Sequence, residues 1–408
     1  MKRIYLDYAS LTPIDPRVTR EMKKYSSRAY ANPSSLYKEG VAAKKALALA
    51  REKVADYINA HADEIIFTGG GTEANNLAIV GVVKAFKNQN DDTDKKPHII
   101  VSAIEHSSIM ETVAELEKNG FNGAEIEVTR LFVDSRGIIS LDELKKAIKS
   151  NTILVSIITV NNEIGSIQPI KEIAKIVRDV RKDSGMGQYP LLHTDAAQAL
   201  YEEINMDNFG VDMLTLDGGK VYGPRGVGVL YVKRTVIESG LIEAITNGGG
   251  QENGLRSGTE NLPGIMGFAR ALELLKSEHF SQLKWEKKEG DRIADLRTLF
   301  IDGLKKIRPD IIINGGDHNN TSDQSSNAQS PHILNISIPG IDNEFFLFKL
   351  DAKGIACSTK SSCLRDEEES YVLKAIGADS KTSLRFSFGR WTKKGDIKRA
   401  LKVIAAVL

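Results

Sequence analysis

The sequence predicts an α/β fold: a large domain with a mostly parallel, buried central sheet, followed by a smaller α+β domain. Two observations lead to this prediction. Short apolar runs typical of buried strands recur along the chain: EIIFT, HIIVSAIEH, ILVSIITV, YPLLHTDAAQ, VDMLTLD and GVGVLYVK. Helical stretches such as 141–149 and 170–183 separate several of these runs, and alternating strands and helices build parallel sheets.

A helix is expected over residues 35–59, where apolar side chains recur at roughly helical spacing, as Val41, Leu47, Val54 and Ile58. After about residue 262 the pattern changes to a long helical region, 262–308. A polar stretch, GGDHNNTSDQSSNAQS, then predicts a surface loop. We assign residues 15–261 to the large domain, and residues 1–14 with 262–408 to the small domain.

The small domain is expected to continue with the strands HILNISI and LRFSFGR and to end in a helix. Thr392 can cap the start of that helix. One face of the helix carries its apolar residues, Ile397, Leu401, Ile404 and Leu408.

Composition excludes several classes of function. The 408 residues carry a net charge of +1, which gives no electrostatic basis for binding nucleic acid or a membrane surface. The longest apolar run, residues 153–160, is too short to span a bilayer, and the first residues lack the apolar stretch of a signal peptide. The two cysteines favour a reducing cytoplasm over a disulfide scaffold, and no cluster around them completes a metal site.

A lysine at a strand end is the first candidate for chemistry. Lys220, in LDGGKVYGPRGVGVLYV, follows one strand and precedes a Gly/Pro-rich turn and a second strand. It is either a surface lysine in a hairpin loop or a desolvated amine that forms a Schiff base. Asp195, in HTDAAQ, ends another apolar strand. It could cap a helix, or keep the ring nitrogen of pyridoxal phosphate (PLP) protonated, with Gln198 donating to the ring oxygen.

Three further motifs are expected on the same edge of the sheet, because ligands bind at the carboxyl ends of parallel strands. In FTGGGTEANN the glycine-rich turn enters a helix, and Gly71 and Thr72 could bind a phosphate there, although tight turns also need glycine. His106, in IEHSSI, could stack on a planar cofactor and shuttle a proton, or be purely structural. Asn162 follows the very apolar strand at residues 153–160.

These motifs, in this order, resemble the class V aminotransferases, and most closely the cysteine desulfurases. The similarity covers nearly the whole chain, from IYLDYAS at residue 4 to SLRFSFGR at residue 390. The resemblance implies a fold-type I PLP enzyme that converts L-cysteine to L-alanine. Sulfur would pass as a persulfide to an acceptor protein, as in iron–sulfur cluster assembly.

The resemblance also implies a role for each residue. Lys220 matches the lysine that holds PLP, Asp195 the partner of the pyridinium nitrogen, Gln198 the ring-oxygen contact and His106 the residue stacked on the ring. Gly71 and Thr72 match phosphate ligands, and Thr259 matches a residue that reaches the phosphate of the neighbouring subunit in a homodimer. Asn162 and Arg385 match the groups that hold the substrate carboxylate.

The sulfur-accepting cysteine of the family lies in a small, polar loop. Here that loop is STKSSC, so Cys363 matches the nucleophile, whereas Cys357 is expected to be a buried small residue of the preceding strand.

The sequence departs from the family pattern near the phosphate. The family usually has Ser and His before the lysine, where this chain has Asp217 and Gly219, and Lys360 stands where the cysteine loop usually has glycine. A carboxylate beside a phosphate is unfavourable unless it points away. Three alternatives therefore stay open: a selenocysteine lyase, an aminotransferase-like enzyme, and a non-catalytic homologue.

Overall fold

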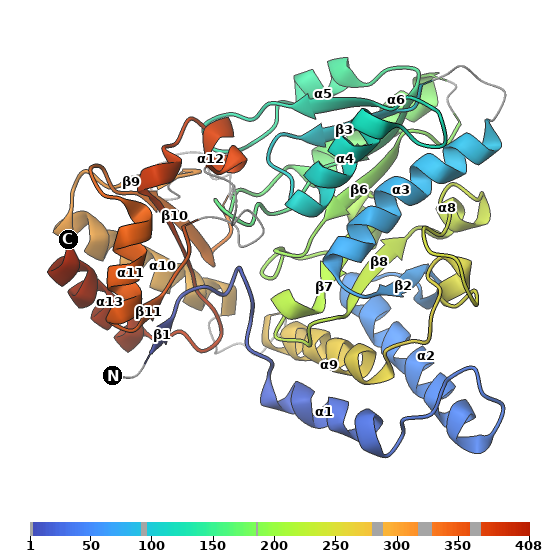
Figure 1. Cartoon of the computed structure of the whole chain (residues 1–408), viewed down its shortest axis with the longest axis horizontal. Helices are drawn as coiled ribbons and strands as arrows, with labels where there is room; N and C mark the ends of the chain where they lie inside the picture. Colours follow the sequence, from blue (N-terminus) through green and yellow to red (C-terminus); the bar gives the residue numbers. More distant parts are fainter. Residues whose placement is uncertain (1–2, 91–95, 185–186, 280–288, 317–328, 360–368) are drawn as a thin grey trace.

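A computed structural model of the chain describes residues 3–90, 96–184, 187–279, 289–316, 329–359 and 369–408. The chain forms two lobes, and its N-terminal segment runs from the smaller lobe to the larger one (Figure 1).

The larger lobe contains a seven-stranded sheet in the order β2-β8-β7-β6-β5-β3-β4. Neighbouring strands among β4, β3, β5, β6 and β7 are parallel, and β8 is antiparallel to both β7 and β2. The predicted mostly parallel sheet is therefore confirmed. Its strands are β2 (Ile65–Thr68), β3 (His98–Ser102), β4 (Glu127–Leu131), β5 (Thr152–Ser156), β6 (Leu191–Asp195), β7 (Met213–Asp217) and β8 (Gly228–Val232).

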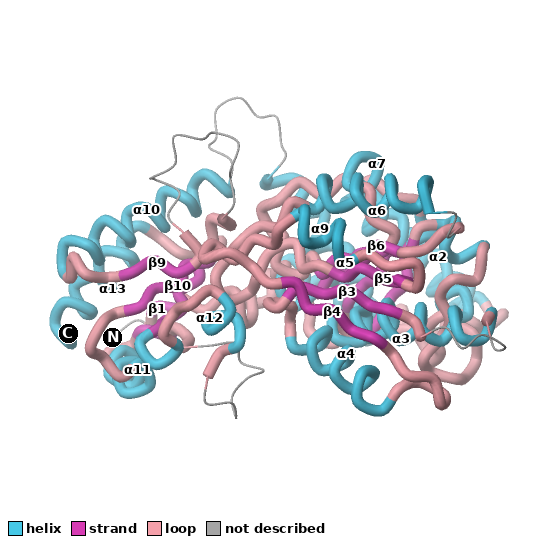
Figure 2. Tube along the Cα trace, turned by 90° about the horizontal axis from the view of Figure 1, so that it is seen from above, coloured by secondary structure: helices cyan, strands magenta, loops and turns pink. Residues whose placement is uncertain are grey.

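Both faces of this sheet are buried, which explains why its strands read as continuous apolar runs. Consecutive residues face opposite sides, so Met213 and Leu214 belong to different cores. One face packs on α3 (Gly71–Gln89), α4 (Ser107–Asn119) and α8 (Arg234–Glu238). The other packs on α1 (Pro16–Ser27), α2 (Lys38–Ile58), α5 (Leu141–Ala147), α6 (Ile170–Ser184), α7 (Met206–Phe209) and α9 (Leu262–His279). Figure 2 shows helices on the two faces.

The smaller lobe has its own apolar core. An antiparallel sheet, β12-β10-β9, packs with a parallel pair, β1-β11. The strands are β1 (Ile4–Tyr5), β9 (Ile312–Asn314), β10 (Ile333–Ser337), β11 (Ile355–Ala356) and β12 (Ser383–Ser387). The helices are α10 (Glu289–Ile307), α11 (Asn343–Ala352), α12 (Tyr371–Ala375) and α13 (Lys394–Val407).

The helical region predicted at 262–308 contains two helices, α9 and α10, and residues 280–288 between them lie outside the described ranges. Helix α9 packs against α1 and α2, and its side chains belong to the core of the large sheet. The division expected from the sequence assigns α9 to the small domain. We propose instead that the large domain extends through α9.

The last helix begins differently from the prediction. Lys393 is its N-cap, and the Asp396 carboxylate accepts from the Lys393 backbone amide at 3.1 Å. The Thr392 hydroxyl instead accepts from the Gly389 amide at 3.0 Å, so the predicted Thr392 cap is wrong. Of the predicted apolar face, Ile397 and Ile404 are buried, whereas Leu408 is exposed.

No helix within the described ranges is long and apolar enough to cross a membrane. These ranges also contain no group of three or more His, Cys, Asp or Glu side chains arranged to hold a metal ion.

Candidate active site

A cavity of about 270 Å³ lies at one edge of the large sheet. Strands β2, β3, β5, β6 and β7 all point toward this edge, and the residues that follow them line the cavity. The N-terminal segment 9–11 and Arg385 of β12 complete the lining. The cavity brings together most of the predicted site residues: Gly71, Thr72, His106, Asn162, Asp195, Gln198, Lys220 and Arg385.

Lys220 is half-buried and lines the cavity from the 3-10 turn Gly218–Lys220 that directly follows β7. Its Nζ donates to the backbone oxygens of Ala9 at 3.0 Å and of Ser10 at 2.6 Å. Strands β7 and β8 are antiparallel neighbours, as a hairpin requires. The lysine between them nevertheless contributes to the cavity, which distinguishes it from an ordinary loop lysine.

Asp195, the last residue of β6, is buried at the floor of the site. One carboxylate oxygen accepts from the Ala197 amide at 2.9 Å and the other from Asn75 Nδ2 at 2.8 Å. A carboxylate held in this way can keep a bound pyridine ring protonated.

A chain of polar side chains connects Asp195 to His106. Asn75 also donates to Ser108 Oγ at 2.8 Å, and Ser108 Oγ lies 2.8 Å from His106 Nδ1. This chain fixes the orientation of the His106 ring at the start of α4. Sequence reasoning missed both Asn75 and Ser108. The sequence did contain one indication of Asn75: it is four residues after Gly71 and therefore lies on the same face of α3.

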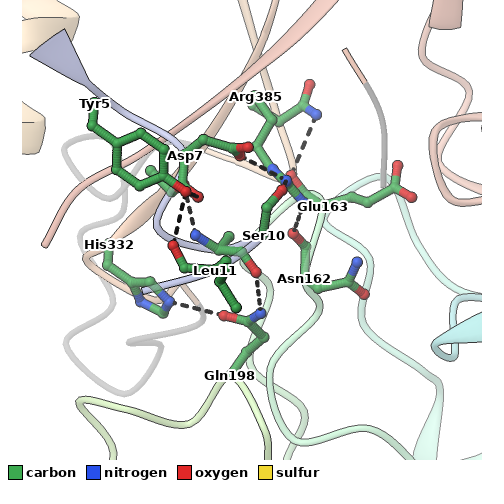
Figure 3. Close-up of polar contacts among 12 residues, drawn as sticks. Tyr5, Asp7, Ser10, Leu11, Asn162, Glu163, Gln198, His332 and Arg385 are labelled. Carbon is green, nitrogen blue, oxygen red and sulfur yellow. Dashed lines mark hydrogen bonds and ion pairs between the residues drawn. The ribbon is translucent and has the colours of Figure 1, made fainter. Parts of the chain in front are cut away.

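The predicted carboxylate-binding residue Arg385 is buried, and its guanidinium is already in contact with protein oxygens (Figure 3). Nη1 donates to the Asn162 backbone oxygen at 2.8 Å, and Nη2 donates to Asp7 Oδ1 at 3.0 Å and Ser10 Oγ at 2.7 Å. Its buried Nε has no hydrogen-bond partner among the described residues. The Nε donor therefore remains available for a carboxylate, and Asp7 is a neighbour that the sequence did not reveal.

Gln198 has more protein contacts than expected. Its amide donates to the Ala9 oxygen at 2.8 Å, and its oxygen lies 3.2 Å from His332 Nε2 (Figure 3). The same N-terminal backbone therefore contacts both Gln198 and Lys220.

Glu105, beside His106, was also missed. It is fully buried, with its Oε1 accepting from Ser102 Oγ and from the Ile158 amide at 2.9 Å. Burial raises the pKa of this carboxyl group to about 8, and the nearby charge of Asp195 adds to the increase. Glu105 is therefore largely protonated at neutral pH.

The glycine-rich loop follows β2, and Gly70 has a φ of +147°, a backbone conformation that favours glycine. Thr72 lies in the first turn of α3, at the cavity. Asp217 turns toward this loop: its Oδ2 accepts from the Gly71 amide and its Oδ1 from the Gly219 amide, both at 2.8 Å.

Thr259 is exposed and is not in the cavity lining. The predicted nucleophile Cys363 lies outside the described residues, as does Lys360. On either side of residues 360–368, Ser358 pairs through its backbone with Arg385, and Ser370 Oγ donates to Glu163 at 2.7 Å. Cys357 packs against the apolar core of the smaller lobe, and burial raises the pKa of its thiol.

The residues present fit PLP at the ring end. A lysine amine, a buried carboxylate and an oriented histidine line one cavity, and the phosphate would be expected at the glycine loop and Thr72. At the phosphate end, Asp217 departs from the family pattern, because its carboxylate lies against the glycine-rich loop.

Comparison with known proteins agrees with this geometry. The family model for aminotransferase class-V matches residues 4–400. The chain is 39% identical to the cysteine desulfurase IscS of Dictyoglomus turgidum, with 100% of this chain and 95% of the relative covered. A solved NifS-like protein superposes with a TM-score of 0.84, at 31% identity over 99% of both chains. A structure described as SspA in complex with cysteine gives a TM-score of 0.76, at 34% identity over 94% of this chain and 98% of the other.

The fold and the cavity thus define a PLP-type enzyme of the aminotransferase class-V family. Within that family, the chain belongs to the cysteine desulfurases.

Proposed function

We propose that this protein is a PLP-dependent cysteine desulfurase that converts L-cysteine to L-alanine and transfers the sulfur, as a persulfide on Cys363, to an acceptor. The observation that carries the proposal is the meeting of Lys220, Asp195, His106 and Arg385 in one cavity, in a chain related over its full length to cysteine desulfurases.

When bound, PLP supplies an electron sink that stabilises negative charge at the substrate Cα. Lys220 would hold the cofactor and move the proton of the substrate Cα. Asp195, oriented by Asn75 and the Ala197 amide, would keep the ring nitrogen protonated. His106, held through Ser108, would cover the ring.

Substrate orientation is assigned to Arg385 and Asn162. The unpartnered Arg385 Nε points to one charge-assisted bond with the substrate carboxylate, and Asn162 lines the cavity beside it.

Cys363 is the proposed nucleophile. It is five residues after Ser358, whose backbone pairs with that of Arg385, a residue of the cavity lining. Its thiolate would attack the substrate Sγ. The Cβ–Sγ bond breaks, the new S–S bond forms, and Cβ takes a proton to become the methyl group of alanine. The thiol must stay reduced between turnovers, so we place the protein in a reducing compartment such as the cytoplasm.

The test is product analysis. Protein loaded with PLP and given L-cysteine and a thiol reductant should release alanine and sulfide in equal amounts. Lys220→Ala should release neither. Lys233→Ala, at an exposed position just after β8, serves as the control and should match the wild type. Cysteine turnover that yields pyruvate or ammonia instead of alanine would rule out the proposed reaction.

A further inference from the structure

Asp217 lies directly against the loop where the cofactor phosphate is expected. Its carboxylate accepts the Gly71 amide at the start of α3 and the Gly219 amide at the start of the lysine turn, both at 2.8 Å. A Cβ on Gly71 would be 3.3 Å from Asp217 Oδ2, and one on Gly70 would be 3.4 Å from it. The carboxylate therefore fills the space beside the loop rather than pointing away from it.

The Gly71 amide bonded to Asp217 is one that an anion would use. The first amides of a helix have no partner within the helix, and together with the helix dipole they attract negative charge. Gly71 is the first residue of α3, and its amide already has a charged acceptor. The Gly69 amide is likewise bonded to Glu73 Oε2 at 2.7 Å.

The two carboxylates differ in how their charge is compensated. Glu73 forms an ion pair with Arg256, with Nε 2.9 Å from Oε1. Asp217 has no ion pair within the ranges that the structure describes, and its charge is met by the two backbone amides. A phosphate entering the loop would therefore both compete for the Gly71 amide and face an unpaired negative charge.

We propose that Asp217 determines how much the phosphate contributes to cofactor binding: it occupies the phosphate-binding end of the cavity and makes this chain a poor discriminator between pyridoxal phosphate and unphosphorylated pyridoxal. The proposal rests on the cofactor assigned under the proposed function.

A purely structural role makes a different prediction. If Asp217 served only to cap α3, its replacement would lower the thermal stability of the cofactor-free protein and affect both cofactor forms equally. Competition with the phosphate instead changes the binding of the phosphorylated form alone. The ratio of the two dissociation constants separates these roles.

The experiment titrates cofactor-free protein with pyridoxal phosphate and, separately, with pyridoxal, and follows the visible absorbance of the Schiff base with Lys220. Wild type, Asp217→Ser and Asp217→Asn are compared. Asp134→Ser is the matched control, because Asp134 also accepts two backbone amides, those of Arg136 and Ile138, but at an exposed turn outside the cavity lining.

Asp217→Ser should strengthen binding of pyridoxal phosphate roughly tenfold or more, the effect of one charge-assisted hydrogen bond, and leave pyridoxal almost unchanged. Asp217→Asn, which keeps the size of the side chain, should change the ratio of the two dissociation constants in the same direction. This variant provides the test if the serine variant fails to fold. Asp134→Ser should keep the wild-type ratio.

Equal or weaker binding of pyridoxal phosphate by a folded Asp217 variant would overturn the inference. Absence of any Lys220-dependent absorbance with either compound is a separate outcome, because it would refute the proposed function itself.

Discussion

At the residue scale, we propose different roles for the two cysteines of the chain. Cys357 packs beside an apolar core, and burial raises the pKa of its thiol, which disfavours the reactive thiolate. We expect Cys357→Ala to keep most of the desulfurase activity. Cys363→Ser should abolish sulfide release while the visible absorbance of bound PLP persists. If Cys363→Ser turns over cysteine at the wild-type rate, Cys363 is not the nucleophile.

Arg385 gives a second prediction, on substrate binding. Arg385→Lys exchanges a planar fork for a point charge, so the contacts with Asp7, Ser10 and the substrate carboxylate cannot all be kept. We expect KM for L-cysteine to rise roughly tenfold to a hundredfold, with a smaller change in kcat. The control is Arg136→Lys, an exposed arginine paired with Asp134. A loss confined to kcat would indicate a role other than substrate binding.

Glu105 gives a prediction on pH. Its pKa is raised from 4.5 to about 8, so between these pH values the folded protein holds a proton that the unfolded chain releases. Stability contributed by this group therefore falls as pH rises through that window, by up to about 1.4 kcal/mol per pH unit. Glu105→Gln cannot titrate. Its free energy of unfolding, measured with urea at pH values from about 5 to about 8, should fall less steeply than that of the wild type.

The control for Glu105 is the exposed Glu111 of α4. Glu111→Gln should follow the wild-type slope. Parallel curves for Glu105→Gln and wild type would mean that the Glu105 carboxyl is not protonated in the folded state.

How far the sequence could predict the site depends on the kind of contact. Lys220, Asp195 and His106 each follow a strand, and the rule that parallel strands place ligands at one edge was sufficient to group them. Asp7 lies 378 residues from its partner Arg385, and no local pattern reveals that pair. The burial that raises the pKa of Glu105 likewise comes from tertiary packing.

At the element scale, β12 and α12 anchor the two ends of the chain that carries Cys363. Ser370 is the N-cap of α12: its Oγ accepts from the Leu373 amide at 3.2 Å and donates to buried Glu163 at 2.7 Å, next to Asn162. Helix α12 is thus bonded to Glu163, the neighbour of the cavity residue Asn162.

Ser370→Ala removes both bonds and should lower the free energy of unfolding by about 1–3 kcal/mol, with a loss of desulfurase activity. The matched control is Ser140→Ala, which removes the N-cap bond to Glu143 of the short helix α5 without touching buried Glu163. Urea unfolding and sulfide release measure both variants. Equal effects in the two variants would show that Ser370 acts only as a helix cap.

Element boundaries were harder to predict than element types. The strands of the large sheet were identified by their apolar runs, and α2 and α6 lie within a few residues of the predicted spans. The start of α13 was misplaced by one residue because Thr392 and Lys393 compete as caps, and the side chain of Asp396 decides between them. The packing of α9 on α1 and α2 depends on contacts between distant segments, which periodicity does not report.

At the scale of the whole molecule, we propose a homodimer in which Thr259, an exposed residue, reaches the cofactor site of the partner. We expect light scattering to give the mass of two chains. Thr259→Ala should weaken PLP binding, whereas Thr235→Ala, on α8, should not. A wild-type protein that is monomeric by light scattering and still binds PLP tightly would contradict this assembly.

The most direct test of the proposed desulfurase is a single turnover without acceptor or reductant. Protein loaded with PLP is mixed with L-cysteine, alanine is quantified per active site, and the thiols are alkylated and mapped by mass spectrometry. We expect one alanine per site and one added sulfur atom on Cys363, with Cys357 unmodified. Alanine formed without a persulfide on Cys363, or no alanine at all, would contradict the proposed function.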